Sequence, residues 1–189
     1  SQNVGTVSMV LQQIYDTLIS RTQDLGLAPG LALRWEQQEP NRWRFWLRDG
    51  VKFHEGEAFT ADDVVFSVTR ALAPTANYGI YVDTVERAVQ AEPMVVDVIT
   101  KIPDPILPNK IASVFIMSRA WSEKNNAARP QNTRQREEMH TVRNTNGTGA
   151  FRLTAIHIAH RHDAAVGQSQ EGVHVPRAHS ADPDAADGD

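Results

Sequence analysis

The segment from residue 43 to residue 72 places the strongest constraint on the fold, because it encodes strand, turn and helix in immediate succession. From Trp43 to Arg48 the side chains follow the period-two pattern of a half-buried strand. Asp49-Gly50 is a strong signal for a tight turn, and residues 51–53 are expected to continue on a paired strand. The segment therefore predicts a fold that combines strands with helices.

A helix is predicted in the second half of this segment, after a break at Glu55-Gly56. Thr60-Ala61-Asp62-Asp63 resembles a capping box, in which the Thr60 hydroxyl accepts a backbone N–H and the Asp63 carboxylate reaches back. Two carboxylates in the first turn also complement the helix dipole. Pro74 is expected to end the helix. One face of this helix is apolar and consists of Val64, Val65, Val68, Ala71 and Leu72.

The acidic residues of the segment do not have the spacing of paired reactive groups. Adjacent helical side chains such as Asp62 and Asp63 diverge by roughly 100°, so they do not converge on one substrate atom. His54 with Glu55 falls short of a metal-ligand set. We therefore expect no catalytic residue and no metal ligand here, and we expect the protein to need no cofactor and not to be an enzyme.

Composition excludes several classes of protein. The 189 residues are 41% hydrophobic, which suffices for one core or two small ones. The net charge of −4 and the absence of a Lys/Arg run argue against nucleic-acid binding. Cysteine is absent, so disulfides and thiolate sites are excluded. No apolar run is long enough for a membrane span, and the start SQNVGTVSMV lacks the features of a signal peptide.

A first helix is predicted near the N-terminus, with Thr6 as its N-cap and the GLAPG run at 26–30 after its end. Its core-facing side is expected to consist of Val7, Val10, Leu11, Ile14, Tyr15, Leu18 and Ile19.

Extended structure is predicted from Val82 to Ile102, as two strands joined at Glu92-Pro93. Prolines at 103, 105 and 108 then exclude a continuous helix or a central strand. An apolar cluster between Leu107 and Ile116 follows this stiff connection.

Five blocks in a fixed order resemble one protein family. They are YDTLI (15–19), LAPGLALRW (27–35), WRFWLRDGVKFHEGEAFTADDVVFSVTRAL (43–72), VVDVITKIPDPILP (95–108) and NGTGAFRL (146–153). This order is similar to that of the family 5 solute-binding proteins of bacterial ABC importers, the oligopeptide, dipeptide and nickel group. The resemblance covers roughly residues 4–153.

The resemblance implies an α/β (α+β) fold of the type II periplasmic-binding-protein class, present here in part. Residues 1–20 would begin lobe I, and residues 21–146 would form the extra domain of the family. Residues 147–153 would re-enter lobe I. The family continues much further, so the chain is expected to be an N-terminal fragment without the second lobe.

The function implied by the resemblance is capture of a short peptide or related small solute by hinge closure, for delivery to ABC permease subunits of the inner membrane. The location implied is periplasmic or otherwise extracytoplasmic. Tyr78 matches an aromatic that reaches the ligand in relatives, although a loop aromatic packed on the extra domain explains it equally well. Val4, Gly5 and Thr6 match a segment that can pair with a bound peptide's backbone.

The affinity of this chain for peptide is expected to be low or absent. In peptide-binding relatives an acidic residue of the second lobe meets the ligand's amino group, and that residue has no counterpart here. A buried ammonium group would then lack its partner, which is unfavourable.

Residues 154–189 form a region of different composition. They contain no aromatic residue and five of the seven histidines, and they are expected to be disordered. A frameshift or truncation of a longer gene is our hypothesis for this tail. His157, His160 and His162 leave open a histidine-dependent metal hydrolase. The resemblance leaves open a second alternative, a metal-chelate-binding member of the nickel branch of the family, which would take up metal without the tail.

Overall fold

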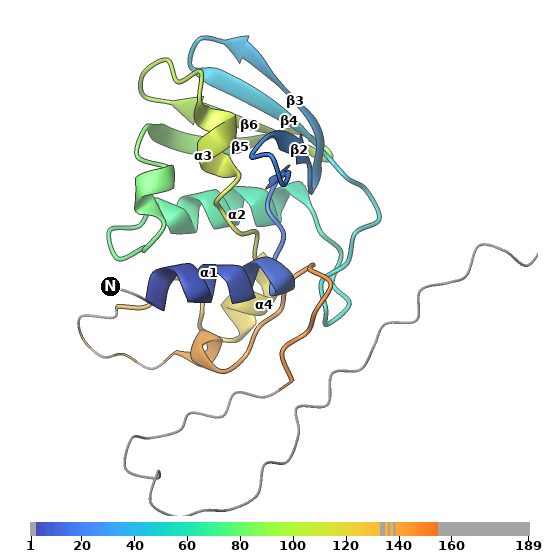
Figure 1. Cartoon of the computed structure of the whole chain (residues 1–189), viewed down its shortest axis with the longest axis vertical. Coiled ribbons are helices and arrows are strands. Elements are labelled where there is room, and N and C mark those ends of the chain that lie inside the picture. Colours follow the sequence, from blue (N-terminus) through green and yellow to red (C-terminus); the bar gives the residue numbers. More distant parts are fainter. Residues whose placement is uncertain (1–2, 133–134, 136, 138, 155–189) are drawn as a thin grey trace, which may run out of the picture. The chain divides into compact units, whose positions relative to one another are not determined.

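The computed structural model describes residues 3–132, 135, 137 and 139–154 (Figure 1). The strands are β1 (Ile19–Arg21), β2 (Leu27–Pro29), β3 (Ala32–Glu39), β4 (Arg42–Leu47), β5 (Val85–Glu92) and β6 (Val95–Thr100). The helices are α1 (Asn3–Ile14), α2 (Ala61–Ala71), α3 (Leu107–Ile111) and α4 (Arg119–Lys124), with short 3-10 helices at Gly79–Tyr81 and His140–Val142. The described residues belong to one compact unit.

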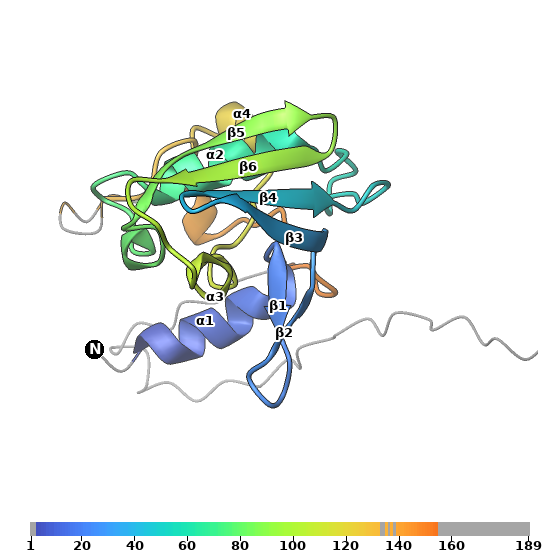
Figure 2. The same ribbon diagram turned by 90° about the horizontal axis from the view of Figure 1, so that it is seen from above.

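A four-stranded antiparallel sheet in the order β3-β4-β6-β5 forms the framework. Helix α2 packs against one face of it, mainly over β5 and β6 (Figure 2). Phe45 and Val96 from the sheet and Val64 and Val68 from α2 are fully buried in the core. The predicted apolar face of the helix is therefore the face that meets the sheet.

The second face of the sheet carries polar and charged side chains. Arg44 and Asp97 are directly opposite each other on β4 and β6. Arg44 donates from Nε and Nη2 to the two carboxylate oxygens at 2.7 and 2.8 Å, and this bonding raises the pKa of Arg44. The guanidinium carbon of Arg34 lies 3.3 Å from the ring centroid of Trp46. Asp97 is buried, and this two-point contact satisfies its charge.

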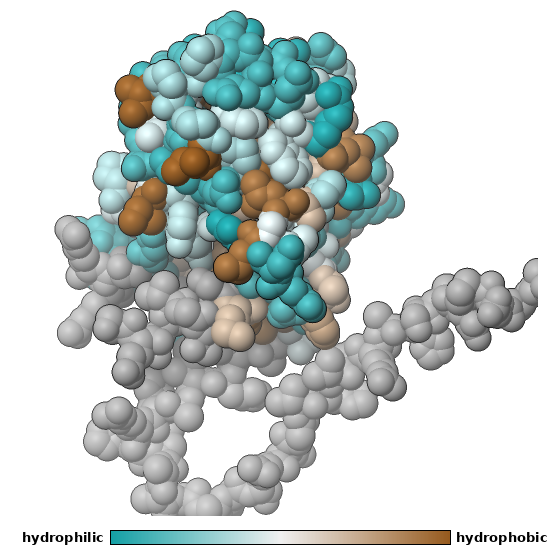
Figure 3. All heavy atoms as spheres, turned by 45° about the horizontal axis from the view of Figure 1, so that its top comes forward, coloured by the Kyte–Doolittle hydropathy of each residue, from teal (hydrophilic) through white to brown (hydrophobic). Residues whose placement is uncertain are grey.

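The surface seen in Figure 3 is mainly hydrophilic, and its hydrophobic side chains form separate small spots. None of the described helices combines the length and apolarity needed to cross a bilayer.

The predicted hairpin around Asp49-Gly50 is wrong in its pairing. Strand β4 pairs with β3 and β6, and residues 51–53 pair instead with residues 57–59. Gly50 does lie in a turn, with φ of 75°. The turn forms as predicted, but the preceding strand β3 and the distant strand β6 occupy both edges of β4.

The predicted first helix is too long at its C-terminal end, and its start is misplaced. Helix α1 begins at Asn3, so Thr6 is not its N-cap, and it ends at Ile14. Leu18 and Ile19 are fully buried as expected, but outside the helix, Leu18 in a bend and Ile19 at the start of β1. Tertiary hydrogen bonding explains the difference, because the main chain of residues 16–18 pairs with residues 30–32 and 116.

The hairpin predicted between residues 82 and 102 is confirmed as β5 and β6, which pair antiparallel. The capped helix is confirmed as α2, with a capping box at its start. The apolar cluster from Leu107 to Ile116 is largely buried. The proposed boundaries at residues 20, 146 and 153 stay predictions, and residues 155–189 lie outside the described part.

Asp63 provides a direct test of the capping argument, with its neighbour Asp62 as the matched control. The Asp63 carboxylate accepts hydrogen bonds from the Thr60 backbone N–H, the Thr60 hydroxyl and the Arg119 backbone N–H. Asp63→Ala should lower the free energy of unfolding by about 2 kcal/mol. Asp62→Ala should change it by less than about 0.5 kcal/mol, because Asp62 is exposed. Urea denaturation measures both, and equal effects would refute the assignment.

Gly147 provides a second test, because its backbone lies against the end of α1. A Cβ atom added there would lie 2.0 Å from the carbonyl oxygen of Ile14, and backbone cannot move aside easily. Gly147→Ala should therefore lower the free energy of unfolding by about 2 kcal/mol or more. At Gly79 the nearest atom is 3.7 Å away, so Gly79→Ala is the control. Similar melting temperatures for the two variants would contradict the packing.

Candidate functional site

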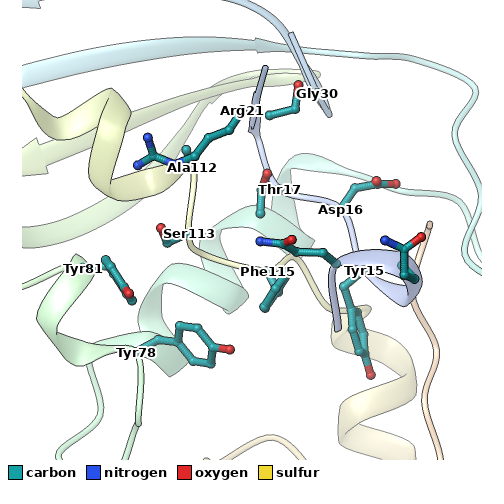
Figure 4. A pocket seen from close by; sticks show the side chains of 13 residues that line it. Tyr15, Asp16, Thr17, Arg21, Gly30, Tyr78, Tyr81, Ala112, Ser113 and Phe115 are labelled. Carbon is teal, nitrogen blue, oxygen red and sulfur yellow. The ribbon is translucent and has the colours of Figure 1, made fainter. Parts of the chain in front are cut away.

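A cavity of about 370 Å³ lies beside the C-terminal end of α1 (Figure 4). This volume falls in the range of small-molecule sites. It is lined by Gln12, Gln13, Tyr15, Asp16, Thr17, Ser20, Arg21, Gly30, Tyr78, Tyr81, Ala112, Ser113 and Phe115. We call it the aromatic cavity.

Main-chain pairing holds the walls of the aromatic cavity together. Ile116 donates its backbone N–H to Asp16 at 3.0 Å, and Thr17 forms a bridge with Phe115. Leu31 donates to the Thr17 carbonyl at 3.0 Å from the other side. Gly30 allows this approach, because a Cβ there would lie 2.6 Å from the Thr17 oxygen. Three segments distant in sequence therefore share one wall.

Four aromatic rings give the cavity its apolar surface. Phe115 lies between Tyr78 and Tyr15, with ring centroids 5.7 and 6.2 Å away (Figure 4). The Tyr78 ring meets Phe115 edge to face, at an interplanar angle of 79°. Tyr81 follows at 6.0 Å from Tyr78. These distances are typical of favourable aromatic pairs, so the rings support one another's orientation.

One negatively charged and one positively charged side chain, Asp16 and Arg21, complete the lining. Asp16 accepts a hydrogen bond from the Thr148 hydroxyl at 2.8 Å through one carboxylate oxygen, and no side chain of the described residues donates to the other. Arg21 donates from Nη2 to the Asn109 carbonyl at 2.7 Å. Apolar walls with a few polar groups are typical of ligand sites.

Tyr15 is the buried member of the aromatic group. Burial raises the pKa of Tyr15 from 10.0 to about 12, although the Asn146 backbone N–H and the charge of Arg70 act in the opposite direction. The neutral phenol is therefore the form present over the physiological range, and it can donate one hydrogen bond.

The predicted site residues differ in where they lie. Tyr78 lines the aromatic cavity. Val4, Gly5 and Thr6 lie in the first turns of α1, in helical backbone, whereas the lining of the cavity starts at Gln12. Main-chain pairing with a peptide at residues 4–6 stays a prediction, and it would require these turns to unwind.

Sequence reasoning did not identify Asp16, Arg21, Tyr81 and Phe115 as lining residues. The sequence pattern places Tyr15 on the core-facing side of a helix and does not indicate that it also lines the aromatic cavity. The only signal available was the density of aromatics near positions 78–81, and no local pattern connects these with residue 115.

His54 and Glu55 have structural partners. His54 Nε2 lies 2.8 Å from the Gly149 carbonyl, and Glu55 accepts a hydrogen bond from the Trp121 indole at 2.9 Å. Within the described ranges, no group of three or more His, Asp or Glu side chains could hold a metal. His157, His160 and His162 lie outside these ranges.

The sequence profile described as "Bacterial extracellular solute-binding proteins, family 5 Middle" matches residues 26–161. The chain belongs to this family. The resemblance noted from the five sequence blocks is thereby confirmed.

Solved structures support the same fold. AppA of Bacillus subtilis in complex with a nonapeptide matches with a TM-score of 0.65 and 20% identity, over 79% of this chain and 29% of AppA. NikZ of Campylobacter jejuni in complex with Ni(L-His) matches with a TM-score of 0.65 and 22% identity, over 76% of this chain and 28% of NikZ. The partial type II periplasmic-binding-protein fold is therefore confirmed.

One curated relative is described as a transcriptional regulator and not as a solute-binding protein. "HTH-type transcriptional regulator SgrR" of Pectobacterium atrosepticum is 33% identical over 122 residues, which is 63% of this chain and 21% of the relative. The chain thus spans about a fifth of the length of this relative.

The raised pKa of Tyr15 can be tested by ultraviolet titration of tyrosinate. One component should ionise near pH 12, and Tyr15→Phe should remove it, whereas the control Tyr81→Phe should leave it. Between pH 10 and 12 the folded chain keeps a proton at Tyr15 that the unfolded chain releases, so Tyr15 should lower the stability as the pH rises. A titration in which Tyr15→Phe changes only the amplitude near pH 10 would contradict this.

Proposed function

We propose that this chain serves in the substrate-binding component of an ABC importer, which captures short peptides or a related small solute outside the cytoplasm. The observation that carries the proposal is the aromatic cavity, found in a chain that belongs to a solute-binding family. The proposed partners are permease subunits of the inner membrane. Binding, without covalent change of the ligand, is the proposed activity.

The chemistry of the cavity supports a zwitterionic or amphipathic ligand. Tyr78 and Phe115 offer ring faces and edges for apolar groups. Asp16 and Arg21 carry opposite charges on the same lining, as a ligand with both an ammonium and a carboxylate group requires. Side-chain identity would be read loosely, because aromatic surfaces accept many shapes.

Hinge closure is the proposed means by which binding is reported to the permease. A ligand that touches two lobes only in the closed form binds this form more tightly and therefore increases its population. The chain spans 28–29% of the two solved structures, so it would provide one side of such a site. Its own affinity should consequently be low.

Two other functions have specific support. The match to NikZ, solved with Ni(L-His), favours a metal chelate as the solute. The match to SgrR favours a role as the ligand-sensing part of a regulator. Both functions would use the aromatic cavity. The first differs from the main proposal in the ligand, and the second differs in the partner that responds to binding.

The ligand proposal is tested by NMR titration of the isotope-labelled chain with tripeptides such as trialanine. We expect amide shifts at Thr17, Ser20 and Ser113, with a Kd on the order of 1 mM, since one wall supplies only part of the contacts. Tyr78→Ala should weaken this binding about fivefold through loss of ring contact.

Phe151→Ala is the matched control, because Phe151 is an exposed aromatic that does not line the aromatic cavity. It should leave the titration unchanged. Repeating the titration with nickel–histidine separates the second candidate ligand from the first. Amide shifts spread over the surface, or equal effects of both substitutions, would argue against this cavity as the ligand site.

A further inference from the structure

A second cavity, of about 320 Å³, shares part of its wall with the aromatic cavity. Tyr15, Tyr78 and Phe115 contribute to the walls of both cavities. The polar lining of the second cavity includes Tyr15, Ser67, Arg70, Asn77, Tyr78 and Thr145. We call it the arginine cavity. The proposed peptide site does not require it.

Arg70, in the last turn of α2, is the charged group of this lining. It donates from Nε to the Ala127 carbonyl at 3.3 Å and from Nη2 to the Arg129 carbonyl at 3.4 Å. Both bonds are long and have neutral acceptors. No carboxylate of the described residues forms an ion pair with Arg70.

The guanidinium group of Arg70 therefore has N–H donors that these two bonds do not use. A guanidinium carries five N–H donors, and the two carbonyls take donors from one edge, formed by Nε and Nη2. The edge formed by Nη1 and the second N–H of Nη2 remains free among the described residues. Burial lowers the pKa of Arg70, which indicates that its charge is poorly solvated. A charge-neutralising partner would relieve this cost.

Thr145 provides an independent observation, and it lines both this cavity and a third one beside Trp121 and His140. Its Oγ1 atom is buried and has no hydrogen-bond partner within the described structure. Buried hydroxyl groups normally have a partner, so an unsatisfied one calls for an explanation. The neighbouring Asn146 backbone N–H and Arg70 both influence the Tyr15 hydroxyl. Arg70, Tyr15 and the 145–146 segment are thus close to one another.

We propose that the arginine cavity is a binding site for a small carboxylate, which pairs with the free edge of Arg70 and accepts the hydrogen bond of the Thr145 hydroxyl. A planar carboxylate fits a guanidinium edge with two parallel hydrogen bonds. The Tyr15 hydroxyl is a further donor at this site. The single positive charge of the lining matches a monoanion, and the neutral hydroxyl groups complete its coordination.

Two structural explanations account for only part of these observations. A basic residue in the last helical turn complements the helix dipole, and donation to two carbonyls anchors the 127–129 segment. Neither gives the second edge of Arg70 a partner among the described residues. Neither explains the unsatisfied hydroxyl of Thr145.

The test is NMR titration of the full chain with propionate, in parallel with the neutral isostere propionamide. Propionate should shift the amides of Ser67, Asn77 and Thr145 saturably, with a Kd on the order of 1 mM, and propionamide should not. Arg70→Gln should weaken propionate binding about tenfold or more, as expected for loss of a charged hydrogen-bonded pair. The control Arg87→Gln removes the same charge from an exposed position and should have no effect.

Thr145→Val keeps the test decisive if Arg70→Gln fails to fold. Because its hydroxyl has no partner in the free protein, this variant should unfold at the same or a higher temperature without propionate. It should bind propionate about threefold more weakly. The proposal is overturned if propionate and propionamide bind alike, if propionate does not bind, or if folded Arg70→Gln and Thr145→Val keep the affinity of the unchanged chain. The aromatic cavity is assessed separately, from the amides of Thr17, Ser20 and Ser113.

Discussion

The rest of the structure depends on the main chain around residues 13–17, which is paired on two sides. On one side, Gly149 and Phe151 donate backbone hydrogen bonds to Ile14 and Gln13 at 2.9 and 3.0 Å. On the other, Ile116 donates to Asp16. Because buried backbone groups require partners, this short stretch decides where helix α1 ends and which three segments meet there.

Both cavities follow from that junction. Tyr15, just after the end of α1, lines both cavities. Phe115 also lines both, and its backbone forms a bridge with Thr17. Gly147 and Gly149 permit the close approach of the last described segment, since a Cβ at either would collide with the backbone of residues 13–14. The two cavities are therefore a product of close backbone contact rather than of any single motif.

The segment from residue 43 to 72 has a different part in the molecule. Its acidic residues are structural: Asp63 caps α2 and also accepts the backbone N–H of Arg119 at 2.8 Å. Asp63 thereby connects the start of α2 to α4. The same helix presents Arg70 to the arginine cavity at its other end. The segment that identifies the family thus forms the framework, and Arg70 within it also lines the arginine cavity.

Sequence alone determined the elements whose information is local. The alternation at 43–48, the cap at Thr60–Asp63 and the hairpin of 85–100 depend on neighbours within a few residues, and all appear as expected apart from the partner of the first strand. The cavities could not be predicted from local sequence patterns, because their lining residues meet only after folding. These include residues 15, 70, 78, 115 and 145. Tertiary structure also decided the end of α1. There, hydrogen bonds to residues 116 and 149 replace the helical bonds that the apolar periodicity favoured, and hydrophobic spacing carries no information about such distant partners.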